Sequence, residues 1–443
     1  MLHKLFKSVF KSGDRTNATN YRPISSLPYL SKIFEKLLKN RILKFFDKYS
    51  LFSESQYGFL KGKSTLDAMI QFVDAIYESL NNKNHHLSIL IDLKKAFDTV
   101  SHPILLKKLE CYGFRGNSLC LISSYLCDRE SYVGIGSAIS GTSISNIGLP
   151  QGSILGPILF LIYINDLPNL SSIVKTTLYA DDTTLSFHNV DLSVTLSSME
   201  SELRKFNDWT LANRLTVNVA KTEALLFSNR IIERRNLNLT LNNEPIRFSK
   251  SCRFLGVIFD NQLTFADHIN DKVNKLSRST GILYGIRGYL SKPARLSFYY
   301  AYMYPNLSYN IPIWGGAGTS HLNKLFIQQK RIVRIICDVA SKTHTSPLFA
   351  QLGLLKLYDI YRFHVLVFMY KAISLGHFGI QHNLNTRQQD MANPVFQRLS
   401  KSQRAISYIG PTIWNNIPIY IRKIDTLSSF KRELKLHFIR SYT

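Results

Sequence analysis

Cysteine is sparse in this sequence and is never closely paired. The 443 residues contain five cysteines, none of which forms a Cys-x-x-Cys spacing: Cys111, Cys120, Cys127, Cys252 and Cys337. A zinc knuckle and a disulfide framework both require paired or regularly spaced cysteines, so this distribution argues against both. It fits a protein that functions in a reducing compartment.

Signals for membrane insertion and export are missing as well. Residues 157–164 are apolar but too few to cross a bilayer. Residues 360–375 are interrupted by Arg362, His364 and Lys371. The N-terminus has neither the long apolar core nor the small-residue cleavage site of a secretory signal. We therefore expect a soluble intracellular protein of the nucleus, the cytoplasm or both, with no membrane partner.

Acidic residues are scarce relative to basic ones. The chain has 55 Lys and Arg against 30 Asp and Glu, a formal net charge of +25. This balance indicates a polyanionic partner, with nucleic acid as the first candidate. A basic membrane-surface protein is the alternative, but no cationic face accompanies a long uncharged apolar helix. The 45% hydrophobic content allows a substantial core, arranged in two to four domains or one multi-lobed enzyme.

Two adjacent acids lie between short runs of strand-forming residues in the segment 178–187, Leu-Tyr-Ala-Asp-Asp-Thr-Thr-Leu-Ser-Phe. The pattern predicts a β-hairpin with Asp181 and Asp182 at its tip. Consecutive side chains on a regular strand point to opposite faces, so both acids can serve one centre only where the backbone bends between them. Such a pair invites a divalent cation. An isolated Asp-Asp pair is more commonly a solvated turn.

A third acid, Asp92, follows the run Leu-Ser-Ile-Leu-Ile, which is typical of a buried strand. An acid at the end of a buried strand either reaches an active-site surface or caps the next helix, and both alternatives stay open at this point. Asp98 follows six residues later.

Two loops that contain glycine lie near these acids in the chain. Residues 56–65, Gln-Tyr-Gly-Phe-Leu-Lys-Gly-Lys-Ser-Thr, include Lys61 and Lys63 and lead into a predicted helix. A basic loop at a helix N-terminus can hold phosphate, although this one is no Walker A motif. Residues 148–157, Gly-Leu-Pro-Gln-Gly-Ser-Ile-Leu-Gly-Pro, lead into an apolar helix expected over 158–166. Their glycines permit close approach of the backbone to a ligand, and the alternative is an ordinary loop–helix junction.

The remaining periodic segments predict helices and short strands. Helices are expected over residues 30–46, 65–80, 102–126 with a break at 113–116, 190–213, 322–337 and 428–440, a hairpin region over 132–145, one strand over 253–260 and a polar loop over 377–400. Lys221 lies between two strand-like runs. In residues 322–337, Lys324, Arg331 and Arg334 lie mostly off the apolar stripe, and they form either a solvated basic face or a contact with a phosphate backbone.

Taken in order, these blocks resemble the catalytic palm of reverse transcriptases, in particular those of non-LTR (LINE-like, jockey/CR1-type) retrotransposons. They are Asn-Tyr-Arg-Pro-Ile-Ser from residue 20, Gln-Tyr-Gly-Phe from 56, Ile-Asp-Leu-Lys-Lys-Ala-Phe-Asp from 91, Gly-Leu-Pro-Gln-Gly-Ser-Ile-Leu-Gly-Pro from 148, Tyr-Ala-Asp-Asp from 179, Asn-Val-Ala-Lys-Thr from 218 and Phe-Leu-Gly-Val from 254. The match covers most of the chain, and the order of the blocks is more specific than any single block. It makes a solvated turn at Asp181 and Asp182 a remote alternative.

The resemblance implies an α+β fold of the right-hand polymerase type, with an antiparallel palm sheet and a helical C-terminal region. The implied domains are fingers (1–86), a palm with the catalytic centre and further fingers segments (87–265), a thumb-like helical region (266–376) and a basic helical extension (377–443). The implied activity is that of an RNA-directed DNA polymerase. It would extend a DNA primer with dNTPs on an RNA template, using two Mg²⁺ ions about 3.5 to 4 Å apart, or Mn²⁺ in their place.

By the same resemblance, Asp92 and Asp181 would bridge the metals, Asp182 would be a ligand with a weaker direct role, and the backbone oxygen of Leu93 would complete the shell, since hard cations require oxygen ligands. Lys221 would protonate the departing pyrophosphate.

Other roles are implied for residues that contact the substrates. The incoming dNTP would be bound by Lys11, Arg22, Phe97, Gln151 and Gly152. The ring of Phe97 would clash with a ribose 2′-hydroxyl, and Asp98 would be structural. Contacts with nucleic acid are expected from the basic residues of the loop after residue 56 and of the helix 322–337, namely Lys61, Lys63, Lys324, Arg331 and Arg334.

Complete elements of this kind usually place an endonuclease before the polymerase, whereas here the polymerase-like blocks begin within about twenty residues of Met1. The sequence therefore predicts a truncated copy that lacks the endonuclease. Two alternatives stay open: a catalytically inactive relic that binds nucleic acid, and a maturase-like splicing factor built on the same fold.

Overall fold

The chain divides into two units, and each is assembled from segments that are distant in sequence. The computed structural model describes residues 4–10, 13–17, 20–127, 129–135, 138–233, 237–376 and 391–442. The N-terminal unit consists of Met1–Ala68, His86–Leu226 and Ile232–Ser249. The C-terminal unit consists of Met69–His85, Phe227–Ile231 and Lys250–Thr443. Because the two units interleave along the chain, the bounds of fingers, palm and thumb stay a prediction.

A five-stranded sheet organises the N-terminal unit. Its strand order is β12 (Arg247–Phe248), β9 (Glu223–Phe227), β3 (His85–Ile91), β8 (Asp182–Asn189) and β7 (Lys175–Tyr179). β7 and β8 are antiparallel, and β12 runs parallel to β9. β3 is the middle strand, and six of its seven residues are buried, which explains its nearly continuous apolar run. The buried strand predicted before Asp92 is confirmed.

Two helices supply apolar side chains to the same core. α5 (Gly156–Ile164) buries every residue except Pro157, and an all-apolar helix of this kind belongs in a protein interior. α6 (Leu192–Ala212) is amphipathic and buries Met199, Leu203 and Phe206. These side chains join those of β3 and β8 in one hydrophobic cluster. The helices predicted over residues 158–166 and 190–213 are confirmed to within a few residues.

The N-terminal unit also contains a second sheet and three further helices. The sheet has the order β2 (Tyr21–Ser26), β1 (Lys4–Phe10), β4 (Arg129–Ile135) and β5 (Ala138–Ile139), with β6 (Ser143–Ser145) paired to β4. The helices are α1 (Tyr29–Lys48), α3 (His102–Cys111) and α4 (Asn117–Leu126), and a small hairpin joins β10 (Thr240–Leu241) to β11 (Glu244–Pro245). The predicted helices, the break after residue 111 and the predicted hairpin region are therefore confirmed.

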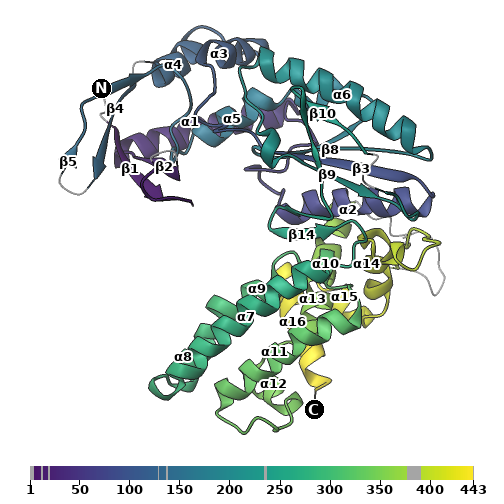
Figure 1. The fold of residues 1–443 in the computed structure, drawn as a ribbon. Coiled ribbons are helices and arrows are strands. Elements are labelled where there is room, and N and C mark those ends of the chain that lie inside the picture. The colour runs from purple at the N-terminus through teal and green to yellow at the C-terminus, as the bar shows by residue number, and fades with distance from the viewer. Residues whose placement is uncertain are drawn as a thin grey trace. The chain divides into compact units, whose positions relative to one another are not determined.

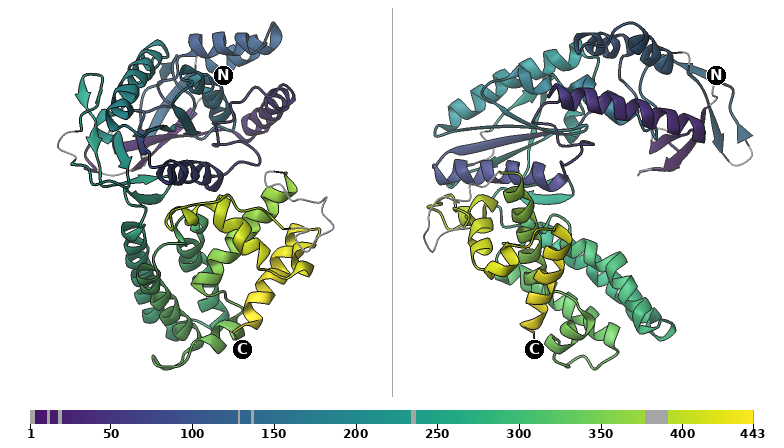
Figure 2. Two further views of the ribbon diagram at one scale, coloured as in Figure 1. Left: turned by 90° about the vertical axis from the view of Figure 1, so that its right-hand side faces the viewer. Right: turned by 180° about the vertical axis from the view of Figure 1, so that it is seen from behind.

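The C-terminal unit is mainly helical (Figures 1 and 2). It comprises most of α2 (Thr65–Asn81), the hairpin β13 (Ser251–Phe254) and β14 (Val257–Asp260), and then α7 (Ala266–Ile286), α8 (Lys292–Phe298), α9 (Tyr304–Ser308), α10 (Ile311–Trp314), α11 (Thr319–Cys337), α12 (Ser346–Leu352), α13 (Leu357–Ser374), α14 (Ile406–Asn415), α15 (Ile419–Arg422) and α16 (Leu427–Arg440). Phe72 of α2 packs against Phe254 and Phe259 of the hairpin, with ring centroids 5.2 and 5.6 Å apart. The helices and sheets together confirm the α+β class.

Two local predictions are wrong. The single strand expected over residues 253–260 is a hairpin, because Leu255 and Gly256 take left-handed φ angles of 44° and 84° and reverse the chain. The strand expected before Lys221 is absent from the described residues: Val217 makes one isolated bridge, and Val219–Lys221 forms a 3-10 turn. Residues 377–390 of the predicted polar loop lie outside the described residues.

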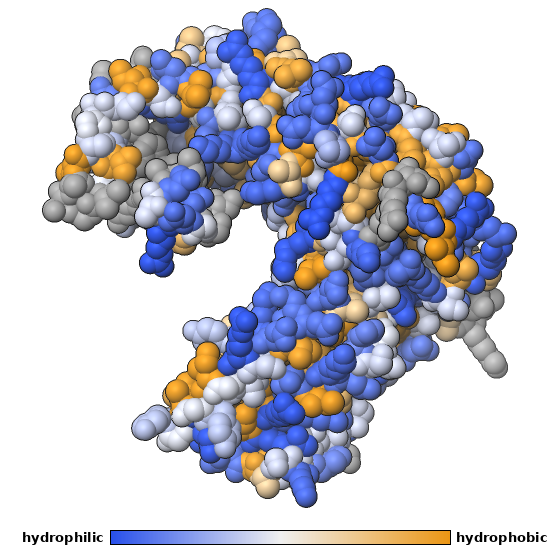
Figure 3. All heavy atoms as spheres, in the orientation of Figure 1, coloured by the Kyte–Doolittle hydropathy of each residue, from blue (hydrophilic) through white to orange (hydrophobic). Residues whose placement is uncertain are grey.

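The surface agrees with the composition of the chain. The face drawn in Figure 3 is mainly hydrophilic, with apolar side chains dispersed among polar ones. No helix within the described ranges has the length and apolar character needed to cross a membrane.

Candidate active site

The two adjacent acids lie at the turn between β7 and β8. Tyr179 pairs with Asp182, so that Ala180 and Asp181 form a two-residue connection. Ala180 takes a φ angle of 56°, in the left-handed region that tight hairpin turns use. Asp181 and Asp182 are both exposed. The predicted hairpin is confirmed, and the backbone bends where both acids need it to bend if they are to serve one centre.

A buried glutamine accepts a hydrogen bond from the backbone of this turn. The Gln56 side chain is 1% exposed, and its Oε1 accepts hydrogen bonds from the backbone N–H of Ala180 at 3.1 Å and of Gly58 at 2.7 Å. The backbones on either side of Gln56 also exchange two hydrogen bonds with Leu178, of 2.8 and 2.9 Å. A Cβ atom on Gly58 would lie 2.4 Å from the Ala180 nitrogen, so only glycine fits there without a shift of the turn. The segment 55–58 thus fixes the position of the acidic turn.

The third acid, Asp92, directly follows β3 and is anchored by Asn218. The Asn218 side chain donates from Nδ2 to Asp92 Oδ2 at 2.8 Å, and its backbone N–H donates to the Asp92 carbonyl at 2.8 Å. Leu93 forms the isolated bridge with Val217, which continues this pairing. Lys221 Nζ lies 3.9 Å from Asp92 Oδ2. The structure therefore brings Lys221 close to Asp92, and the proton-donor role of Lys221 stays a prediction.

The three acids influence one another electrostatically. Partial removal from water, and then the negative charges of Asp181 and Asp92, raise the pKa of Asp182 to about 6. The Asp182 residue as a whole nevertheless stays exposed. A bound divalent cation would relieve the repulsion among these carboxylates.

The donor set fits a divalent metal, although it is not a ready-made cage. No group of three or more His, Cys, Asp or Glu side chains in the described part of the chain is arranged to hold a metal ion. The carboxylate of Asp92, directly after β3, and those of Asp181 and Asp182, at the turn into β8, nevertheless offer hard oxygen atoms of the kind that such a cation requires. The carbonyl of Leu93 as a fourth ligand stays a prediction.

The loop from Gly148 is tied to the chain that follows Asp92. The backbone N–H of Gly148 donates to the Val100 carbonyl at 2.8 Å, and that of Leu149 donates to the Phe97 carbonyl at 2.7 Å. Arg129 Nη2 donates to the Gly148 carbonyl at 2.6 Å. The loop and the acid are therefore held in one local framework.

Gln151, predicted to position template and nucleotide, is itself held by two contacts. Its Nε2 donates to Asp98 Oδ1 at 2.8 Å, and its carbonyl accepts from the backbone N–H of Ser25 at 2.8 Å. Gly152 has a φ angle of 96°, and a Cβ atom there would lie 3.2 Å from the Ser25 carbonyl oxygen. Phe97 is half-buried, and its ring stacks on Phe160 with centroids 4.5 Å apart. The nucleotide contacts of Phe97, Gln151 and Gly152 stay predictions.

The basic side chains predicted to contact nucleic acid differ in their surroundings. Lys61 is exposed, whereas Lys63 Nζ donates to the carbonyls of Glu54 at 2.9 Å and Gln56 at 2.8 Å. Burial lowers the pKa of Lys63. Its ammonium group therefore stabilises its own loop, next to the Gln56 side chain that contacts the acidic turn.

The other basic candidates lie partly outside the described structure. Lys324 and Arg331 are exposed on α11, whereas Arg334 Nε donates at 2.9 Å to a backbone carbonyl nine residues later. Lys11 lies outside the described residues. Arg22 lies in β2, but its side chain is not among those described.

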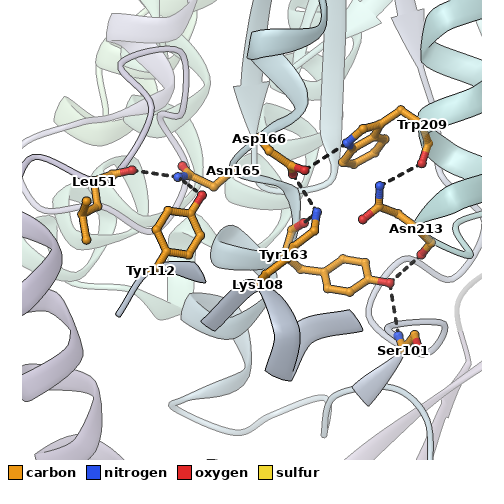
Figure 4. A network of polar contacts seen from close by, with 9 residues as sticks. All are labelled: Leu51, Ser101, Lys108, Tyr112, Tyr163, Asn165, Asp166, Trp209 and Asn213. Carbon is orange, nitrogen blue, oxygen red and sulfur yellow. Dashed lines mark hydrogen bonds and ion pairs between the residues drawn. The ribbon is translucent and has the colours of Figure 1, made fainter. Parts of the chain in front are cut away.

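Sequence reasoning missed a polar network around the residues that follow α5 (Figure 4). Asn165, just after α5, donates from Nδ2 to the Leu51 carbonyl at 2.7 Å and accepts from the Ser53 N–H at 2.9 Å. Asp166 pairs with Lys108 Nζ at 2.7 Å. The network also includes Ser101, Tyr112, Tyr163, Trp209 and Asn213. It anchors the segment that leads to Gln56, and no local sequence pattern marks it because its partners are up to 114 residues apart.

Asp92 and the Asp181–Asp182 pair are thus coupled electrostatically, and Lys221 lies beside Asp92. The family model "Reverse transcriptase (RNA-dependent DNA polymerase)" matches residues 9–259, and the chain belongs to this family. Two curated relatives come from Drosophila melanogaster. The chain is 29% identical over 370 residues to "RNA-directed DNA polymerase from mobile element jockey" and 28% identical over 347 residues to "Probable RNA-directed DNA polymerase from transposon X-element".

These alignments cover 81% and 77% of this chain but 39% and 38% of the two relatives, so the chain spans about two fifths of their length. Among solved structures, telomerase from Candida albicans is similar with a TM-score of 0.42 and 13% identity, over 87% of this chain and 65% of that chain. The resemblance to non-LTR reverse transcriptases that the sequence indicates is confirmed by the family and the curated relatives.

The raised pKa of Asp182 predicts a pH-dependent cost to stability. Its folded-state pKa of about 6 lies above the ordinary value of 3.8, so the folded chain binds more protons and loses stability as the pH rises from about 4 through about 6. Replacing Asp182 by asparagine should raise the unfolding temperature of the metal-free protein at pH 7.5 by about 1–3 °C, because exposure to water keeps the effect small. Thermal unfolding at pH 4 and 7.5 checks this prediction.

The advantage of the Asp182→Asn variant should vanish at pH 4 and shrink when Mg²⁺ is added at pH 7.5. Asp208→Asn, which changes an exposed acid on α6, is the matched control and should show no such pattern. Equal pH profiles for wild type and Asp182→Asn would contradict the electrostatic coupling.

Proposed function

We propose that the chain is the RNA-directed DNA polymerase of a non-LTR retrotransposon, which extends a primer 3′-hydroxyl with dNTPs on an RNA template. The observation that carries this proposal is the placement of Asp92 directly after β3 and of Asp181 and Asp182 at the turn into the neighbouring strand β8. The electrostatic coupling of these acids supports their action on one centre. The proposed fold is the right hand, with fingers, palm, thumb and basic extension at the bounds predicted from the sequence.

In this proposal Asp92, Asp181 and Asp182 hold two divalent cations, for which Mg²⁺ is the first choice and Mn²⁺ a substitute. When bound, such ions supply charge stabilisation for the attacking and leaving oxygens. Lys221 donates a proton toward the departing pyrophosphate, which is general-acid chemistry. Asn218 keeps the Asp92 carboxylate oriented through its 2.8 Å hydrogen bond.

The remaining predicted residues serve substrate binding. Phe97 faces the sugar and excludes a 2′-hydroxyl, whereas Gln151 and Gly152 position nucleotide and template. Lys11 and Arg22 reach the triphosphate, and exposed basic residues on both units, such as Lys61, Lys324 and Arg331, contact the phosphate backbone. The partners are thus an RNA template and a DNA primer, in the nucleus, the cytoplasm or both.

Primer extension tests this function. The purified chain is given an RNA template with a DNA primer, and incorporation of dNTPs is compared with that of rNTPs, in Mg²⁺ and in EDTA. Metal-dependent incorporation that prefers dNTPs is the expected result. Binding of RNA that weakens with salt but is accompanied by no incorporation would instead favour the inactive nucleic-acid-binding relic.

Lys221 is expected to act on the rate and not on the fold. Replacing Lys221 by methionine should lower the single-turnover rate about 10²-fold, because a positioned general acid contributes about 10²–10⁴-fold. The unfolding temperature should stay within about 1 °C, since the Lys221 side chain is 63% exposed and such pairs contribute little to stability. Lys205→Met on α6 is the control, as its ammonium also pairs with one acid, Glu202, at 2.8 Å. A rate unchanged by Lys221→Met would reject the proton-donor role.

A further inference from the structure

The start of helix α5 is buried, and its backbone donors need partners other than water. The first residues of any helix have N–H groups without an intrahelical acceptor. At α5 the Gly156 N–H donates to Ser153 Oγ at 2.9 Å, and Pro157 has no N–H. The N–H groups of Ile154 and Leu155 remain to be satisfied within the protein.

Glu35 of α1, more than a hundred residues earlier in the sequence, supplies the acceptor for both N–H groups. Its side chain is 0% exposed, and its Oε2 accepts from the N–H of Ile154 at 2.6 Å and from that of Leu155 at 3.2 Å. Its Oε1 accepts from the Tyr125 hydroxyl of α4 at 3.2 Å. A carboxylate is also the favourable charge at a helix N-terminus. Glu35 thus joins α1 and α4 to the point where the loop from Gly148 enters α5.

The position of this contact connects it to the proposed nucleotide site. Ile154 is three residues after Gln151, whose side chain is held by Asp98 and whose carbonyl is held by Ser25. Those two contacts hold the middle of the loop, and the hydrogen bonds from Gly148 and Leu149 hold its beginning. Glu35 and Ser153 hold its end.

We propose that Glu35 is a positioning residue of the polymerase centre, which keeps Gln151 and Gly152 where the incoming nucleotide requires them. The proposal rests on the proposed function. It requires an acceptor of glutamate length and not the charge itself, since an amide oxygen at the position of Oε2 can accept both N–H groups while the amide nitrogen donates to Tyr125.

Three substitutions of Glu35 separate the effect of side-chain length from that of the negative charge. Glu35→Gln should keep the KM for dNTP within about threefold of wild type. Glu35→Asp keeps the charge but is one methylene shorter, and Glu35→Leu removes the acceptor. Both should raise the KM for dNTP, by about 10- to 100-fold for leucine, because a displacement of about 1 Å at a reacting centre can cost about 10²-fold. Glu35→Asp keeps the test informative if the leucine variant does not fold.

Ile42→Ala is the matched control, because Ile42 is a buried residue of the same helix that contributes to the hydrophobic core. It should lower the unfolding temperature without raising the KM for dNTP. An active wild-type chain whose KM is unchanged in Glu35→Asp and Glu35→Leu would overturn the role of Glu35, as would an equal KM increase in Ile42→Ala. A wild-type chain that incorporates no dNTP would instead reject the proposed function itself.

Discussion

Replacing Asp181 by alanine is expected to abolish primer extension while leaving the protein folded. The side chain is exposed at the turn between β7 and β8, so its removal creates no cavity. It removes one of the three carboxylates proposed to hold the divalent cations. A loss of at least about 10³-fold in rate is expected, since a single well-placed electrostatic group at a reacting centre is already worth about 10²–10³-fold. Single-turnover extension in Mg²⁺ measures this effect.

Two controls make the result specific to the charge at the turn. Asp181→Asn keeps the size of the side chain and should lose as much activity as alanine, because a neutral amide is a poor ligand for a hard cation. Asp208→Ala removes an exposed acid from α6 and should retain wild-type activity. Full extension by Asp181→Ala would count decisively against the proposed centre, whatever the other variants do.

Gly58→Ala is expected to have the second largest effect, although residue 58 has no side chain that could react. An added Cβ would lie 2.4 Å from the Ala180 backbone nitrogen, so either the turn with Asp181 or the segment after Gln56 must move. The rate should fall about 10²-fold, because misplacement of a reacting group by about 1 Å costs that much. Overpacking should also lower the free energy of unfolding by about 1–3 kcal/mol.

Gly141→Ala is the matched control for this backbone change, since an added Cβ there meets no atom within 4 Å. It should leave both the rate and the unfolding temperature unchanged. If Gly58→Ala loses stability but keeps the wild-type rate, the contacts of Gln56 and Gly58 with the turn stabilise the fold without positioning the acids.

Local patterns predicted most of the elements that surround the site. The apolar run before Asp92 forms β3, and the alternation around Asp181 and Asp182 forms the hairpin β7–β8. These segments are predictable because the period of apolar residues within a few positions decides between helix and strand. The single strand expected over residues 253–260 was wrong because the apolar pattern does not show the turn within it. Leu255, a residue type that usually avoids positive φ, takes a φ angle of 44° in that turn.

The contacts that hold the site were not predictable in this way. The sequence from Gln56 predicts a basic loop that can hold phosphate, which stays a prediction. It does not indicate that Gln56 accepts a hydrogen bond from the turn or that Lys63 donates to carbonyl groups of its own loop. Asn218 belonged to a recognised block, yet its hydrogen bond to Asp92 joins residues 126 positions apart. A sequence pattern marks which residues are polar, but the partner of each polar group depends on how distant segments pack.

By itself, the sequence determined which chemical groups are available for the proposed reaction. The types and order of its residues identify three carboxylates, a lysine and a glycine-containing loop, because ligand hardness and backbone freedom depend on residue type alone. Tertiary structure decided how those groups are held: Gln56 behind the turn, Asn218 on Asp92, and Glu35 at the start of α5. Buried backbone N–H and carboxylate groups must find partners within the fold, and only the packing of segments distant in sequence brings those partners within hydrogen-bonding distance.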